Sequence, residues 1–149
     1  MTGARAARLF CATTLIALPA FAGPAAGDGP DAARGRALFV GDAPLSGRIA
    51  LHPGDLPAEV LRCANCHDSA GSPRVQRTVA PPLTRAWLIA PRERRGGPSS
   101  RYDMASFCRL LETGQDPAQL IVNVQMPRYA VPASDCAALW QYLVDEQRG

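Results

Sequence analysis

Two cysteines and a histidine stand close together near the middle of the sequence, as Cys63-Ala64-Asn65-Cys66-His67. This C-x-x-C-H spacing is the attachment motif for c-type haem. Thiols three residues apart on one helical turn can reach both vinyl groups of one porphyrin, and the next residue then places an imidazole under the iron. The motif predicts one haem c, bound covalently through Cys63 and Cys66, with His67 as an iron ligand.

Other uses of these cysteines compete with haem attachment. A zinc site could recruit Cys108 and Cys136, but these lie far apart along the chain, whereas zinc sites usually take a second closely spaced pair. A thioredoxin-like redox pair needs a βαβ context, which is not visible here. A chance match within a disulfide framework is the third alternative. Export, a helical pattern and the adjoining His67 together favour haem.

The N-terminal segment 1–22 has the layout of a secretory signal peptide. Arg5 and Arg8 supply the positive region, an apolar stretch follows, and Ala20-Phe21-Ala22 is an A-x-A cleavage site. The apolar stretch is shorter than the roughly 20 residues of a membrane span, which argues against an uncleaved anchor. We expect a mature domain over 23–149, without a membrane span, in the oxidising periplasm. In that compartment the first interpretation of a cysteine is a disulfide or a bound cofactor, before a free thiol.

Composition limits the architecture and the partners. A chain of 149 residues is enough for one domain, and its Gly and Pro are scattered without a period, which excludes collagen-like and solenoid folds. The formal charge is +3, and Arg5 and Arg8 fall in the segment to be removed. The near balance that remains excludes the clustered basic excess of nucleic-acid binders.

Helical patterns dominate the mature chain, and no stretch alternates convincingly. The sequence predicts helices over 31–40 and 103–113, a short helix from Ala58 into Cys63, another opening at Asp116-Pro117, and a last helix capped by Ser134. The stripe on the second of these places Met104 beside apolar residues, which predicts a core position. The fold class is therefore all-α, with several short helices and long loops.

At this point the chain resembles the class I cytochrome c family over most of its mature length. In that family an N-terminal helix with a glycine and an aromatic residue crosses a C-terminal helix that bears aromatics. Gly35 and Phe39 are similar to the first pair, and Trp140 and Tyr142 to the second. The resemblance implies a cytochrome c domain over 23–149, with its helices and loops wrapped around one covalently attached haem.

The resemblance also implies roles around the iron. A Pro-x-Leu sequence follows the attachment motif in the family, and here Pro81 and Leu83 match it, so the Pro81 carbonyl would accept a hydrogen bond from His67. The sixth ligand is usually a methionine before the last helix, and Met126-Pro127 matches. Position alone also favours Met126, since it lies in a loop; His52, Met104 and an open site remain alternatives.

Two further features have more than one interpretation. Cys108 and Cys136 lie on apolar helix stripes in an oxidising compartment, which predicts a disulfide, with two buried free thiols as the alternative. The arginine-rich loop over 92–101 fits a docking patch for an acidic partner, a solvated loop or a clamp for haem propionates.

An iron held by His67 and Met126 has no position for a substrate. The sequence therefore predicts a periplasmic electron carrier and not an enzyme. Its partners would be redox proteins, with a dehydrogenase as donor and an oxidase or another cytochrome as acceptor. The alternatives are a haem enzyme or gas sensor with a displaceable sixth ligand, and a fixed cytochrome subunit of a larger dehydrogenase.

Overall fold

The computed structural model describes residues 30–67 and 80–145; the expected signal peptide lies outside them. The element order is α1 (Pro30–Val40), β1 (Gly47–Arg48), the 3-10 helix η1 (Cys63–Asn65), α2 (Arg85–Ile89), α3 (Met104–Thr113), β2 (Arg128–Tyr129) and α4 (Ala133–Asp145). The fold is mostly helical, as predicted, and β1 and β2 add a small antiparallel sheet. Within the described ranges, none of the helices has the length and apolar character of a membrane-spanning segment.

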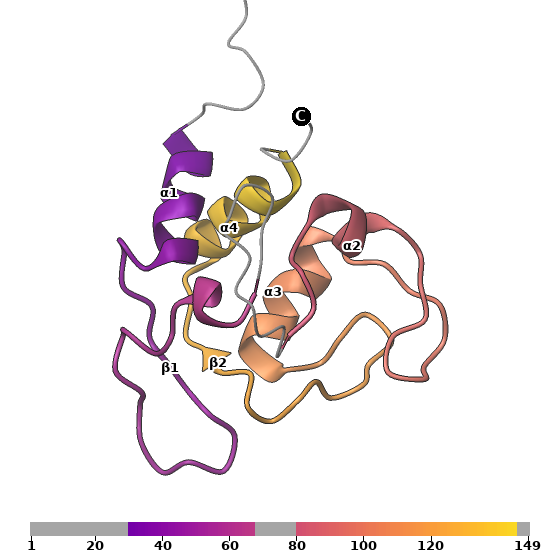
Figure 1. Cartoon of the computed structure of the whole chain (residues 1–149), viewed down its shortest axis with the longest axis horizontal. Helices are drawn as coiled ribbons and strands as arrows, with labels where there is room; N and C mark the ends of the chain where they lie inside the picture. Colours follow the sequence, from indigo (N-terminus) through magenta and orange to yellow (C-terminus); the bar gives the residue numbers. More distant parts are fainter. Residues whose placement is uncertain (1–29, 68–79, 146–149) are drawn as a thin grey trace, which may run out of the picture.

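The first and last helices pack directly against each other (Figure 1). Gly35 makes this approach possible, because a Cβ added there would lie 2.0 Å from the carbonyl oxygen of Ala138 on α4. One turn further along α1, the rings of Phe39 and Tyr142 meet with centroids 5.6 Å apart. The helix crossing that the family resemblance implies is thus present. Trp140 turns instead toward α3, with its ring centroid 5.5 Å from that of Phe107.

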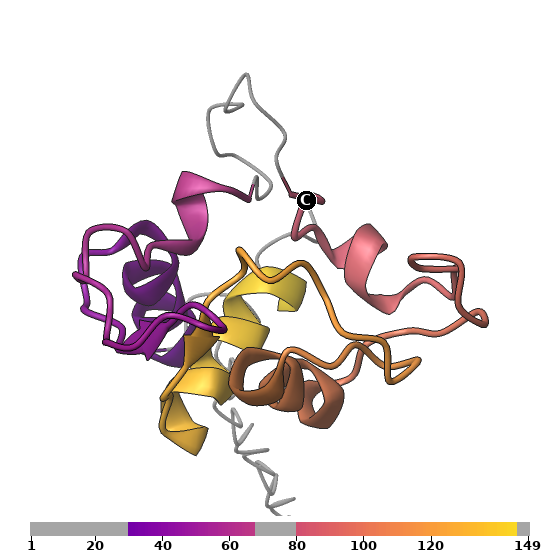
Figure 2. The ribbon, with the colours of Figure 1, turned by 90° about the horizontal axis from the view of Figure 1, so that it is seen from below.

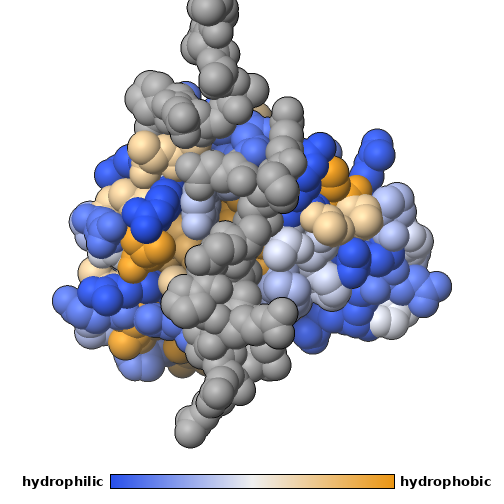
Figure 3. Space-filling model, turned by 45° about the horizontal axis from the view of Figure 1, so that its top comes forward, coloured by the Kyte–Doolittle hydropathy of each residue, from blue (hydrophilic) through white to orange (hydrophobic). Residues whose placement is uncertain are grey.

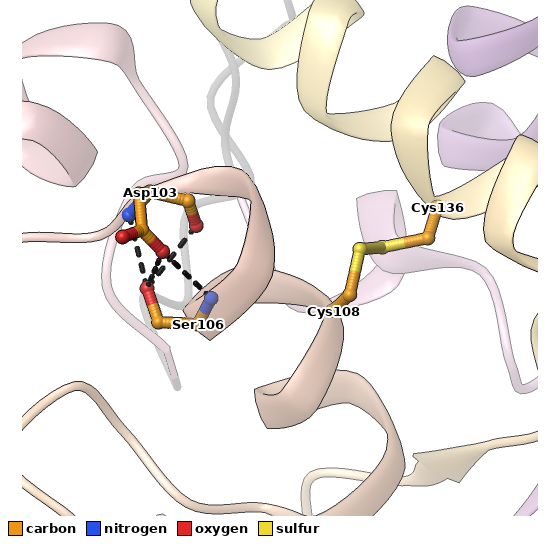
Figure 4. The surroundings of a disulfide bond; sticks show 4 residues. All are labelled: Asp103, Ser106, Cys108 and Cys136. Atoms are coloured by element: carbon orange, nitrogen blue, oxygen red, sulfur yellow. Dashed lines mark hydrogen bonds between the residues drawn. A yellow bond between two sulfur atoms is a disulfide. The ribbon is translucent and has the colours of Figure 1, made fainter.

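A disulfide joins α3 to α4 (Figure 4). It links Cys108 to Cys136 across 5.9 Å between their Cα atoms, which confirms the predicted pairing. The bridged helices share the core with α1. Fully buried side chains of this core are Leu38, Phe39, Leu61, Leu88, Leu139 and Leu143.

The start of α3 is fixed by a capping box, which Figure 4 also shows. The Asp103 carboxylate accepts the Ser106 backbone N–H at 2.7 Å, and the Ser106 hydroxyl accepts the Asp103 N–H at 2.9 Å. Two backbone donors that the first turn leaves without helical partners are thereby satisfied. The hydrogen bonds from the Ser106 side chain and backbone lower the pKa of Asp103 from its ordinary value of 3.8.

We expect Asp103→Ala to lower the free energy of unfolding by about 1 kcal/mol at neutral pH. The pKa of Asp103 is lower in the folded state than in the unfolded state. The stabilisation that comes from its charge is therefore fully present above the unfolded-state pKa, and it is lost as the pH falls through the folded-state pKa. Denaturant unfolding of both proteins from pH 7 to pH 3 should therefore show the difference narrowing with acid. A difference that widens on acidification would contradict this assignment.

Four predicted helical features are wrong. The segment from Ala58 forms turns, and the short helix begins only at Cys63. The segment opening at Asp116 is a compact turn, because its carboxylate and backbone both bond to Leu120. Met104 is 49% exposed, so it is not a core residue. The last helix begins at Ala133, one residue before the predicted cap.

Candidate functional site

The C-x-x-C-H segment forms one tight turn on η1. The backbone N–H groups of Cys66 and His67 both bond to the Cys63 carbonyl, at 3.2 and 2.9 Å. Asn65 anchors the turn by donating its side-chain amide to the Glu59 carbonyl at 2.8 Å. Cys63 is buried, Cys66 is exposed, and neither is in a disulfide. The turn thus brings both thiols and the imidazole together on one short segment.

His67 is oriented by the segment that leads into α2. Its Nδ1 lies 2.7 Å from the Pro81 carbonyl oxygen. A carbonyl oxygen only accepts, so Nδ1 carries the hydrogen and Nε2 is the ring nitrogen that would bind a metal. This is the contact that the family resemblance implies for Pro81, and such a partner fixes the orientation and tautomer of a ligating histidine.

A cavity of about 390 Å³ opens beside this turn. Its size suits an organic cofactor, since ligand pockets of roughly 300 to 1,000 Å³ are usual. Apolar side chains from α2, α3 and α4 line it, among them Leu88, Leu110 and Leu139. Every residue predicted to hold the cofactor also lines it, namely Cys63, Cys66, His67, Pro81, Leu83 and Met126.

Met126 reaches the cavity from the segment that joins α3 to β2. In Figure 2 this segment runs between η1 and α2. The side chain is half-buried at the cavity wall. The other ligand candidates lie elsewhere: Met104 is on the exposed face of α3, and His52 is in an exposed loop where its Nδ1 contacts Gly54. Neither lines the cavity.

One part of the cavity wall is polar, which sequence reasoning missed. Asp116 is only 1% exposed. Its Oδ1 accepts the Leu120 N–H at 2.9 Å, and its Oδ2 has no hydrogen-bond partner among the residues that the structure describes. Arg94 also lines the cavity, and its buried Nε has no hydrogen-bond partner within 30–67 and 80–145. Buried polar atoms rarely stay unpaired. The Arg94 Nε is a donor that suits a carboxylate substituent of a mostly apolar cofactor, such as a haem propionate, whereas the Asp116 Oδ2 is an acceptor and would need a different partner.

The two thiols of the motif differ in their exposure to solvent, because Cys63 is buried and Cys66 is exposed. Burial, with a smaller contribution from the nearby Cys66, raises the pKa of the Cys63 thiol to about 12, although hydrogen bonds with its own backbone and with Tyr129 act in the opposite direction. Cys63 therefore remains a neutral thiol at physiological pH. The exposed Cys66 is instead open to solvent.

The structure argues against a zinc site that uses Cys108 and Cys136 as its second pair of ligands. Cys108 and Cys136 are bonded to each other in the disulfide, so they are not available to join Cys63 and Cys66. Among residues 30–67 and 80–145, no three His, Cys, Asp or Glu side chains gather as a metal-binding group. A zinc site built from the four cysteines is incompatible with this arrangement.

The arginine-rich loop is partly an internal scaffold. Figure 3 shows mainly hydrophilic residues on the side of the molecule where this loop lies. Arg94, however, is only 6% exposed, and its guanidinium donates to the carbonyls of Trp87, at 2.9 Å, and of Ser100. The same guanidinium lies over the Tyr102 ring, 4.9 Å from its centroid. Arg94 therefore cannot serve a docking patch, whereas Arg95 and Arg101 are exposed.

Arg94→Gln is expected to lower the free energy of unfolding by about 1 to 3 kcal/mol, because buried carbonyls lose their donor. Arg95→Gln is the matched control, as it removes the same charge from an exposed neighbour. It should change stability by no more than about 0.5 kcal/mol. Thermal unfolding of both variants measures the difference, and equal effects at the two positions would show that Arg94 is not a scaffold residue.

Comparisons of the chain with models of protein families, with curated proteins and with solved structures find no match. A function must therefore be inferred from the residues around the cavity.

Proposed function

We propose that this protein is a single-haem c-type electron carrier with a cytochrome c fold, which works in the periplasm after removal of residues 1–22. The proposal depends most on one observation. The cysteines and histidine of the attachment motif share a single cavity with Met126, although 59 positions separate Met126 from His67 in the sequence. Proline and leucine from a third segment, Pro81 and Leu83, line the same cavity.

Different residues of the protein would attach the haem and bind its iron. Cys63 and Cys66 would attach it covalently, and His67, held by the Pro81 carbonyl, would present Nε2 to the iron. Met126 would supply a thioether from the other ligand segment. When bound, haem iron supplies a one-electron redox couple, and thioether ligation raises its reduction potential. The apolar lining from α2, α3 and α4 limits the access of water, which also affects the potential.

Two protein ligands leave no position for a substrate, so the proposed role is electron transfer and not catalysis. The partners would be redox proteins, a dehydrogenase that donates electrons and an oxidase or another cytochrome that accepts them. The Cys108–Cys136 disulfide supports an oxidising compartment, since such bridges persist mainly in exported proteins.

Carbon monoxide tests the carrier against the gas sensor or haem enzyme. The full chain, produced with its N-terminal segment in a bacterium that matures c-type cytochromes, is reduced and exposed to the gas. A carrier with both axial positions filled should keep its absorption spectrum almost unchanged. A large shift of the reduced bands would instead show a displaceable sixth ligand, and co-purification with a dehydrogenase would favour a fixed subunit.

A further inference from the structure

The segment that carries Met126 contains no helix, so other contacts must hold its backbone. Within the segment, the Met126 N–H bonds to the Asn123 carbonyl at 3.0 Å, and the Gln125 N–H bonds to the Asn123 side chain at 2.9 Å. Both are local turn contacts. They shape the turn, and the segment is attached to the end of α3 four residues before Met126, where the Val122 N–H bonds to the Gly114 carbonyl at 2.9 Å. Neither kind of contact holds the Met126 carbonyl itself.

Arg128 makes a contact of a different kind. Its Nη1 donates to the Met126 carbonyl at 2.7 Å. Its guanidinium also lies directly against Gly114, the residue that ends α3 with φ +76°. A Cβ at Gly114 would lie 2.0 Å from the guanidinium carbon of Arg128, so the glycine leaves the space that this group occupies. The guanidinium therefore bridges the end of α3 and the backbone of Met126.

The backbone of Arg128 is itself anchored. It pairs with Arg48 in the β1–β2 sheet. The next residue, Tyr129, donates its hydroxyl to the Leu61 carbonyl at 3.1 Å, two residues before the first cysteine of the motif. Arg128 thus occupies a fixed position between α3, the sheet and the methionine that lines the cavity.

We propose that Arg128 is the positioning residue for Met126. Its guanidinium, lodged against Gly114, holds the Met126 carbonyl and so fixes the backbone from which the thioether reaches the iron. A charge-assisted hydrogen bond from a planar, partly buried guanidinium suits this task better than a lysine ammonium would. The inference rests on the proposed function, in which Met126 is the sixth ligand.

Imidazole competition against the ferric protein tests the inference. In Arg128→Gln we expect the apparent affinity for imidazole to rise about tenfold, because the methionine is held less firmly. Arg128→Lys should restore part of the parent affinity. The matched control is Arg48→Gln, which removes the same charge from the exposed strand partner and should leave the affinity within about twofold of the parent.

The possible outcomes separate the inference from the proposed function. Parent-like imidazole affinity in Arg128→Gln, with haem still attached, would overturn the role of Arg128. Equal affinity in the parent and in Met126→Ala would instead overturn Met126 as a ligand, and with it the proposed function. If Arg128→Gln does not accumulate with haem attached, Arg128→Lys is compared with Arg48→Lys instead. Equal imidazole affinities of these two variants would overturn the inference.

Discussion

Met126→Ala is expected to open a coordination position on the iron, lower the reduction potential and allow carbon monoxide to bind the reduced protein. The physical reason is the loss of the thioether, which in the proposed function would both fill the sixth position and raise the reduction potential. Met126 is also the methionine that lines the cavity shared with His67. Redox titration and a carbon monoxide difference spectrum of the purified variant measure both effects.

Met104→Ala is the matched control, since it removes the same side chain from the exposed face of α3. Because Met104 is 49% exposed, its truncation should lower the free energy of unfolding only slightly. The absorption spectrum and the reduction potential should stay unchanged. If Met126→Ala retained the spectrum and potential of the parent, the ligand assignment would be wrong.

Removing the Cys108–Cys136 bridge is expected to lower the free energy of unfolding by roughly 3 to 4 kcal/mol, from the chain entropy that a loop of this size gains in the unfolded state. The bridge closes the loop that carries Met126 and ties it to α3 and α4. Denaturant unfolding of the Cys108→Ala/Cys136→Ala double variant, compared with the parent, measures the loss.

A reducing agent supplies the internal control for the bridge. In its presence the parent should lose stability, while the double variant should not change. Alkylation of the unfolded parent without reductant should leave Cys108 and Cys136 unmodified. Two alkyl groups on these residues would refute the disulfide, and equal stability of the two proteins would refute its stabilising role.

Local signals in the sequence predict the longer helices well. α1 and α3 follow from an acidic start, an apolar stripe and a glycine after the last turn, and α4 follows from its stripe. Such signals fail where the structure depends on distant contacts. α2 has only five residues, too few to show a helical period, and Met104 lies at the edge of a stripe whose buried part is set by packing against α4.

The same distinction applies to the site. The turn at Cys63–His67 is encoded locally, and its motif predicts the cofactor that we propose. The polar wall is different, because Arg94 and Asp116 are distant in sequence and meet only around the cavity. An arginine in an arginine-rich loop and an aspartate before a proline were the available signals, and both are common in exposed loops. Arg128 has no sequence signal beyond its place next to Met126-Pro127.

Mass spectrometry of the cysteine-bearing peptide tests covalent haem attachment most directly. The full exported chain is reduced, alkylated and digested with trypsin, and the peptide that follows Arg62 is weighed. We expect it to carry the mass of one haem, with Cys63 and Cys66 protected from the alkylating agent, while Cys108 and Cys136 are alkylated. A peptide without added mass and with both cysteines of the motif alkylated would contradict the proposed function.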